Sequence, residues 1–161
     1  MANDTAGNID RVWELMKKIG FAMLVTHDGD KLRARPMSVL PEREHNALYL
    51  LTDARHHKDE EIAANPNINL SFADPGGQKY VSITGTAAIS NDRAKIRELF
   101  SMPAKAWWKS ADDPNIRVLK IEPDDAEFWD SPGSVISYVK MAAAAVTGTR
   151  PDIGENRKVP M

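Results

Sequence analysis

Residues 31–40 read KLRARPMSVL, a run of strand-forming residues that also contains two arginines and a proline. Alternate residues of a strand point the same way, so Arg33, Arg35 and Met37 share one face. The residues between them make the other face apolar. Pro36 has no N–H to give a neighbouring strand, which predicts an edge, a bulge or a place where the neighbour has parted. The segment therefore predicts a strand with one cationic face at an opening in a sheet.

Such an opening would leave backbone donors and acceptors free near Met37 and Ser38, where a planar heteroaromatic ligand could use both. In the alternative interpretation, the arginines are solvated side chains of an edge strand, where charge discourages aggregation. The segment taken alone favours this alternative. Residues elsewhere in the chain decide between the two.

Short strand-like runs joined by turn residues flank this segment on both sides. Gly85 interrupts one of the longer runs and is expected to mark a bulge or a tight bend. Parallel sheets need a crossover helix after each strand, and the sequence lacks that rhythm. We therefore expect a mainly β, α+β protein with six or seven antiparallel strands in a small, closed or nearly closed barrel. The expected strands cover 21–27, 31–40, 47–53, 67–73, 79–90, 116–123 and 125–131.

Three or four short helices are expected around the barrel. Apolar residues at helical spacing predict a first helix over residues 9–19, with Gly20 as its C-terminal cap. A second helix is expected to end at Pro66, and Asp92 is expected to be the N-cap of a third. The last helix would open at Ser131–Pro132, since proline is tolerated at the first helical position.

The chain has 161 residues, of which 42% are hydrophobic, enough for one sizeable core but not comfortably for two. We expect one domain over residues 1–161, structured from about 9 to 155 with looser termini. The formal net charge of -2 argues against a nucleic-acid partner. A membrane partner is not expected either, because no apolar run approaches the roughly 20 residues that span a bilayer and the N-terminus lacks a signal-peptide pattern.

The chain contains no cysteine. Disulfides, thiolate metal sites and thiol nucleophiles are therefore excluded. The absence of cysteine fits a reducing compartment, and the cytoplasm is the expected location.

A second set of polar residues follows the expected strand at 47–53, in the segment DARHHKDEEI. Helix N-termini attract phosphate through their free N–H groups and their dipole, and a lysine there adds charge. Two neighbouring strands would bring Arg35 and Lys58 to one end of the sheet, with Thr52 between them as a neutral partner. This arrangement predicts a phosphate site. In the alternative interpretation, His57 and Lys58 pair with acidic residues on a solvated helix.

A metal site is a further alternative, because His56 with Glu60 and His57 with Glu61 are i, i+4 pairs. No motif supplies a third ligand. Acidic residues also suit the start of a helix without any metal. We therefore expect no metal site.

Two adjacent tryptophans, Trp107 and Trp108, lie in the polar segment KAWWKS. They are hard to explain as packing within their own segment. They could seal the end of the barrel or a dimer interface, where tryptophan is enriched. Alternatively, one of them walls a flat ligand bound between subunits.

Several short motifs then occur in a specific order: RPM, LT, NPNINLSFADP, YVSITGTAA, DRAKIRELF, AWW and AEFWDSPG. In this order they resemble the pyridoxamine 5'-phosphate oxidase-like FMN-binding split barrels, and among these the bacterial general stress protein branch. The resemblance covers about residues 9–155, and the order of the motifs is more specific than any one of them. It implies a split β-barrel homodimer with FMN at the subunit interface, with FAD as the alternative cofactor.

The resemblance also implies roles for particular residues. Arg35 matches the arginine that begins the flavin-contacting strand, and the three residues after it match the backbone that faces the isoalloxazine ring. Thr52 matches the threonine that ends the next strand, with Leu51 in place of the oxidase's tyrosine. His57 and Lys58 match an Arg-Lys pair that holds the phosphate. The implied cofactor-binding residues are Arg35, Pro36, Met37, Ser38, Leu51, Thr52, His57, Lys58 and Trp108.

The sequence departs from the oxidase pattern at three places. His57 replaces an arginine, which would make phosphate binding weaker and pH-dependent, since histidine is charged only part of the time near neutral pH. Tyr80 stands where the oxidase has a flavin-contacting glutamine. The oxidase's C-terminal arginine and histidine motif is missing, and the tail RPDIGENRKVP resembles the stress protein branch. Pyridoxamine phosphate oxidation is therefore not expected.

Two functions follow from the resemblance. In the first, the protein is a flavin-dependent oxidoreductase of unknown electron partner, in which FMN supplies the redox chemistry and Trp108 shapes the substrate side. In the second, it is a flavin-binding stress protein or sensor without turnover. A dimer that has lost flavin, or one that binds haem through a histidine, ranks below both. The sequence names no catalytic residue.

Overall fold

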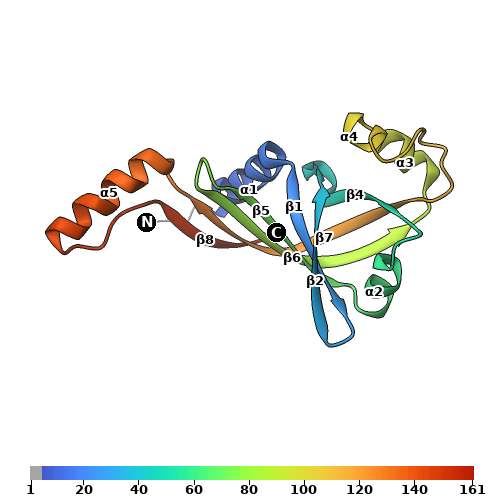
Figure 1. Ribbon diagram of the computed structural model, residues 1–161, viewed down its shortest axis with the longest axis horizontal. Helices are drawn as coiled ribbons and strands as arrows, with labels where there is room; N and C mark the ends of the chain where they lie inside the picture. The colour runs from blue at the N-terminus through green and yellow to red at the C-terminus, as the bar shows by residue number, and fades with distance from the viewer. Residues whose placement is uncertain (1–4) are drawn as a thin grey trace.

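The computed structural model describes residues 5–161. An antiparallel sheet of eight strands forms its centre, with five α-helices around it (Figure 1). The 3₁₀ turn η1 (Arg43–His45) precedes the fourth strand. The helices are α1 (Thr5–Ile19), α2 (Lys58–Ala64), α3 (Arg93–Leu99), α4 (Met102–Lys105) and α5 (Ser134–Thr147). The strands are β1 (Phe21–Asp28), β2 (Lys31–Ser38), β3 (Leu40–Glu42), β4 (Ala47–Asp53), β5 (Asn67–Asp74), β6 (Lys79–Ser90), β7 (Ile116–Asp130) and β8 (Glu155–Pro160).

The strands follow the order β2-β1-β5-β6-β7-β4-β3, and β8 pairs with β7 outside this path. Strands β2 and β3 are therefore the two ends of this path, and β8 forms a further edge beside β7. Strand β2 approaches β4 across the opening, but among the described residues no ladder joins them. The sheet is barrel-like and not closed, which confirms the predicted mainly β, α+β split barrel. The edge position of β2 also agrees with the proline inside it.

The structure has eight strands where the sequence predicted six or seven. The extra strands are β3 and β8, and the two strands predicted at 116–123 and 125–131 form one continuous strand, β7. Their apparent boundary is a bulge, because the pairing register shifts from Thr84↔Asp125 to Gly85↔Pro123. Gly85 lies at this bulge, as predicted. A Cβ atom there would come within 2.5 Å of the carbonyl oxygen of Glu122, so the close approach of the two strands requires glycine.

The helix ends follow the sequence signals with one exception. Gly20 caps α1 with φ 74°, and its N–H donates to the carbonyl oxygen of Met16. Asp92 is the N-cap of α3 and accepts a 3.0 Å hydrogen bond from the backbone N–H of Lys95. The last helix begins at Ser134 and not at Pro132, because Gly133 takes the N-cap position in a conformation outside the helical region, with φ 111°.

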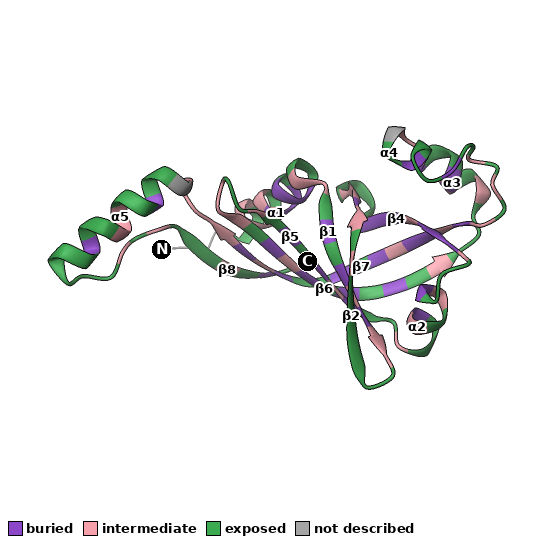
Figure 2. Cartoon of the chain, viewed as in Figure 1, coloured by how far each residue is buried: buried purple, intermediate pink, exposed green. Residues whose placement is uncertain are grey.

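The buried residues form two clusters, which share strands β4 and β7. Figure 2 shows how the buried residues are distributed along the strands and helices. The first fills the barrel and is built on inward side chains such as Leu24, Leu70 and Phe128. The second lies beneath α3 and α4. Strand β4 serves both clusters, since Leu48 and Leu50 face the barrel and Tyr49 faces the second cluster. The members of the second cluster are Ala47, Tyr49, Ile96, Leu99, Ala104, Trp108, Ile116 and Val118.

Regular structure extends beyond the expected range of 9–155, because α1 starts at Thr5 and β8 ends at Pro160. The expectation of a loose N-terminus falls partly on residues 1–4, which lie outside the described residues. Over residues 5–161, no helix is both long enough and apolar enough to cross a membrane.

Candidate functional site

A cationic cavity lies at one end of the barrel, between the β1–β2 hairpin and α2. Its volume is about 680 Å³. Four arginine or lysine side chains and two acidic side chains line it, so its formal charge is +2 with both histidines neutral. Such a lining suits a dianionic group such as a phosphate monoester. The lining residues are Asp28, Arg33, Arg35, Arg55, His56, His57, Lys58 and Glu61.

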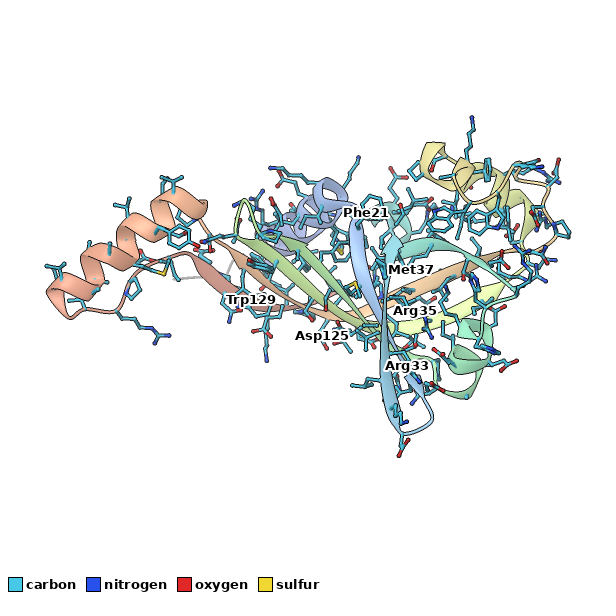
Figure 3. All side chains as sticks on the ribbon, viewed as in Figure 1. Phe21, Arg33, Arg35, Met37, Asp125 and Trp129 are labelled. Atoms are coloured by element: carbon cyan, nitrogen blue, oxygen red, sulfur yellow. The ribbon has the colours of Figure 1, made fainter. Side chains whose placement is uncertain are left out.

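Arg35 reaches this cavity from the inward face of β2. Figure 3 shows Arg33, Arg35 and Met37 in succession along this strand. Met37 packs against the barrel core, which fixes the side of the sheet that the alternate residues face. The Nη1 atom of Arg35 donates to Thr26 Oγ1 at 2.9 Å, and its Nη2 atom donates to Glu61 Oε1 at 2.5 Å. These two bonds use two of the five N–H donors of the guanidinium.

Glu61 of α2 completes a small hydrogen-bond network with Arg35 and Thr26. Its Oε2 atom accepts a 2.6 Å hydrogen bond from the buried hydroxyl of Thr26. The hydrogen bond from Arg35 holds the pKa of Glu61 below its ordinary value, although burial acts in the opposite direction. Glu61 is therefore ionised and holds the Arg35 side chain in place on the cavity wall.

Lys58 is the first residue of α2 and is only 8% exposed. Burial lowers its pKa from the ordinary value, and the positive charge of Arg35 lowers it further. Arg35 and Lys58 line the same cavity, so the structure brings together the two cations from which the sequence predicted a phosphate site. An anion bound between them would offset both the desolvation of Lys58 and the repulsion.

Thr52 is the last residue but one of β4, on the other side of the opening from β2. It is 2% exposed, and its Oγ1 atom has no hydrogen-bond partner among the described residues. On β4 it shares the inward face with Leu48 and Leu50. A buried hydroxyl without a partner is costly, and a ligand that supplies an acceptor would remove the cost. Thr52 is not among the residues that line the cavity, so its role as a neutral partner to a bound group stays a prediction.

Arg55 lines the cavity, and Asp53 holds its side chain in place. Asp53 Oδ1 accepts hydrogen bonds from the Nε atom and the backbone N–H of Arg55, both at 2.9 Å, and Asp53 Oδ2 accepts one from Nη2 at 2.5 Å. The indole Nε1 of Trp108 also donates to Asp53 Oδ2, at 3.3 Å. These bonds, led by those from Arg55, hold the pKa of Asp53 well below its usual range.

The remaining predicted residues lie in three places. His57 lines the cavity and precedes α2, with Nδ1 3.6 Å from Glu60 Oε2. Pro36 and Leu51 lie on strands that flank the opening, but their side chains point away from the barrel core, which is consistent with a role for their backbones. Ser38 ends β2 opposite Phe21. Trp108 is buried in the second cluster and reaches the cavity only through Asp53 and Arg55.

The predicted cofactor-binding residues did not include Thr26, Glu61, Arg33 or Arg55. Arg33 could have been added, because it shares a strand face with Arg35. Arg55 lies in the same DARHHK segment as Lys58. Thr26 and Glu61 carry no signal of their own, since their role depends on α2 packing against β1. Among residues 5–161, no group of three or more histidine or acidic side chains could hold a metal ion.

The chain is similar to known proteins in sequence and in fold. The family model described as pyridoxamine 5'-phosphate oxidase like matches residues 7–152. General stress protein 26 of Bacillus subtilis is 35% identical over 87 residues, which make up 52% of this chain and 62% of that protein. The alignment therefore spans less than two thirds of the relative.

Two solved structures extend the comparison to the whole fold. A protein assigned as general stress protein 26 from Jannaschia sp. CCS1 is 26% identical, with a TM-score of 0.78 over 97% of this chain and 99% of that one. The general stress FMN/FAD binding protein from Xanthomonas citri is 21% identical, with a TM-score of 0.67 over 78% of this chain and 89% of that one. The second likeness shows a shared fold.

Proposed function

The chain belongs to the pyridoxamine 5'-phosphate oxidase-like family, and we propose that it binds FMN in the cavity of Arg35 and Lys58 and acts as a flavin-dependent oxidoreductase of the general stress protein type. The observation that carries the proposal is the convergence of these two cations, from separate segments, on one cavity at the opening of the barrel. The relative from Xanthomonas citri, which is an FMN/FAD binding protein, supports the same cofactor class.

The residues present fit a flavin phosphate. The cavity lining has a net charge of +2, which balances a phosphate dianion. Arg35 and Lys58 would contact the phosphate, and the unpartnered Thr52 hydroxyl would donate to a phosphate or ribityl oxygen. The backbone of residues 36–38, on the edge strand beside the opening, would face the ring system. Glu61 would keep Arg35 oriented while sharing it with the ligand.

Bound FMN would supply hydride or electron transfer, and the protein would supply position and solvent exclusion. No side chain is assigned as an acid or base. Lys58 and Arg35 would hold the phosphate end of the cofactor. The flavin ring would then extend along the edge strand β2, whose residues 36–38 would face it. The proposed assembly is a homodimer with the flavin ring at its interface. The proposed location is the cytoplasm, and residues 1–161 would act as one flavin-binding domain.

The phosphate assignment is tested by the double substitution Arg35→Ala and Lys58→Ala. Two charge-assisted hydrogen bonds are lost, so the Kd for FMN should rise at least about a hundredfold. Riboflavin, which lacks the phosphate, should bind the native and the double variant equally. The matched control replaces two exposed lysines of the α4 region, Lys105→Ala and Lys109→Ala, and should leave FMN binding unchanged. An unaltered FMN affinity in the double variant, with a native circular dichroism spectrum, would refute the assignment.

Turnover is tested separately from binding. The flavin in the pure protein is reduced, and its reoxidation by added acceptors is followed by visible absorbance. An oxidoreductase should pass electrons to at least one acceptor faster than free FMN does. A protein that only stores or senses flavin should bind FMN with the same phosphate dependence and show no such acceleration.

A further inference from the structure

Helix α5 is built with its apolar side outward. It lies in an arm that projects from the barrel, formed by the end of β7, α5 and the returning strand β8 (Figure 1). Val135, Val139 and Val146 are 75%, 64% and 89% exposed. The opposite side of the helix carries Ser137 and Ala144, which are buried. A helix in water normally has the reverse arrangement, with its apolar stripe covered.

The exposed residues form one continuous stripe. Val135, Val139, Ala142 and Val146 are spaced by four, three and four residues, so they line one side of the helix. Ile136 and Tyr138 flank this stripe and are also exposed. No other element of the described chain makes extensive contact with α5. The stripe is therefore not covered by the chain that carries it.

The base of the arm is fixed rather than loose. Asp130, at the end of β7, binds Arg11 of α1 at 2.5 Å and Lys79 of β6 at 2.7 Å. Lys79 also donates to the carbonyl oxygen of Ser131 at 2.7 Å, and β8 pairs with β7 from Asp125 to Asp130. These bonds hold the arm in one direction, away from its own barrel (Figure 1).

A second exposed apolar surface lies on the outward face of the β1–β2 hairpin. Ala22, Leu24 and Thr26 are buried inside the barrel, so Phe21 and Met23 point outward. Register places Pro36 beside Met23 and Leu32 beside His27 on the same side. Ten large apolar side chains are exposed among the described residues, of which five lie on α5 and three on this hairpin face.

We propose that the arm docks on a second copy of this chain, with the α5 stripe packed on the outward face of the partner's β1–β2 hairpin. Each chain offers one stripe and one hairpin face, so a twofold axis satisfies both surfaces of both chains at once and closes the assembly. Both surfaces are apolar and nearly uncharged, as the core of a stable interface requires. The inference rests on the proposed function only in taking the protein to be a homodimer. It adds that α5 is the element that joins the two chains.

The dimensions of the two surfaces match. A helix of 14 residues is about 21 Å long, and a strand of eight residues is about 26 Å long. The contact occurs twice, which brings the buried area towards the roughly 1,600 Å² of a standard interface. The hairpin's inner face carries Arg35, so the arm of one chain would lie behind the cofactor cavity of the other.

The first test changes the polarity of the stripe without weakening the helix. Val135→Gln, Val139→Gln and Val146→Gln are combined, since glutamine forms helices at least as well as valine. The matched control places leucine at the same three positions. Sedimentation velocity should show a dimer for the native protein and the leucine variant, and a dimer dissociation constant at least a hundredfold higher for the glutamine variant. Equal dissociation constants for the two variants would overturn the proposal.

The second test locates the contact. The native chain contains no cysteine, so Val139→Cys and Met23→Cys can be joined selectively by a short bismaleimide. The double variant should form a covalent dimer, and neither single variant should. A covalent dimer of the Val139→Cys variant alone would show helix-to-helix pairing and overturn the proposal, as would a double variant that stays uncoupled.

FMN titration of the native chain reports on the proposed function independently of these tests. If the native chain binds FMN but the glutamine substitutions leave the dimer dissociation constant unchanged, the arm contact alone is refuted. A native chain that dimerises through the stripe but binds no FMN would refute the cofactor alone.

Discussion

The guanidinium Nη2 of Arg35 lies 2.5 Å from Glu61 Oε1, on the wall of the cavity that Lys58 also lines. A carboxylate at this position has two opposed effects on an anionic ligand. It adds a negative charge near the phosphate, and it keeps a flexible arginine in the orientation that binding needs. The net charge of the lining stays positive because three other cations share the cavity. The ion pair with Glu61 therefore favours anion binding, by orienting Arg35, more than its negative charge opposes it.

The first prediction concerns the pH dependence of this ion pair. The folded protein lowers the pKa of Glu61 below its ordinary value of 4.5, chiefly through the hydrogen bond from Arg35. A group with a lowered folded pKa contributes stability that is present above about pH 4.5 and is lost as the pH falls through the folded value. Glu61→Gln should therefore cost roughly 1–3 kcal/mol at pH 7 and much less near pH 3.

Urea denaturation at several pH values measures this effect. Glu60→Gln is the matched control, because Glu60 lies on the same helix with an exposed side chain. It should change the free energy of unfolding by less than about 0.5 kcal/mol at every pH. A Glu61→Gln variant that loses stability with acid as steeply as the native protein would contradict the prediction.

The second prediction uses the buried hydroxyl of Thr52. Thr52→Val keeps the shape and removes an oxygen that has no partner among residues 5–161. Without ligand, the variant should be as stable as the native protein or more stable by about 1 kcal/mol. Its affinity for FMN should fall about five- to tenfold, because the ligand loses one hydrogen bond. Chemical denaturation and fluorescence titration measure the two effects, and a variant with unchanged FMN affinity would remove Thr52 from the site.

The third prediction separates the stability and function of Lys58. Burial and the nearby Arg35 lower its pKa, so the unfolded chain binds more protons than the folded one between the lowered value and 10.5. Stability from this residue therefore rises with pH through that window. Lys58→Met should stabilise the ligand-free protein at pH 7 by about 1 kcal/mol and lower its affinity for FMN at least about tenfold.

Lys105→Met is the control for this substitution, because Lys105 is exposed on α4. It should alter neither quantity. Thermal unfolding without ligand and isothermal titration with FMN and riboflavin provide the measurements. Equal losses of FMN and riboflavin affinity in Lys58→Met would indicate damage to the fold and not loss of a phosphate contact.

The fourth prediction concerns the bulge between β6 and β7. Gly85→Ala would place a Cβ atom 2.5 Å from the backbone carbonyl oxygen of Glu122, where no flexible side chain can move aside. The variant should lose about 1–3 kcal/mol of unfolding free energy. Gly76→Ala is the matched control, since its Cβ would meet only the Asp74 side chain at 3.6 Å. Similar denaturation midpoints for the two variants would show that the strands can separate there.

Much of the fold was predictable because its signals are local. Gly20, Asp92 and Gly85 each mark a feature that depends on the conformation of a few neighbouring residues. The two strands predicted at 116–131 were wrong because Pro123 reads as a break, whereas the bulge opposite Gly85 absorbs it within one long strand. The strand β8 was not predicted, since its six residues pair only after the chain has returned past α5.

The candidate site shows the same division. Alternation along the chain was enough to put Arg35 and Met37 on one face of a strand, and the charge of the DARHHK segment was enough to suggest an anion partner. Only the folded chain shows that Lys58 lines the same cavity as Arg35 and that Thr26 and Glu61 hold the arginine. It alone shows, too, that the Thr52 hydroxyl has no partner within the described part of the chain. The outward stripe of α5 likewise becomes visible only when its neighbours are known. Strand faces, caps and turns follow from residues a few positions apart, whereas burial and ion pairing depend on distant segments meeting in space, which tertiary packing alone decides.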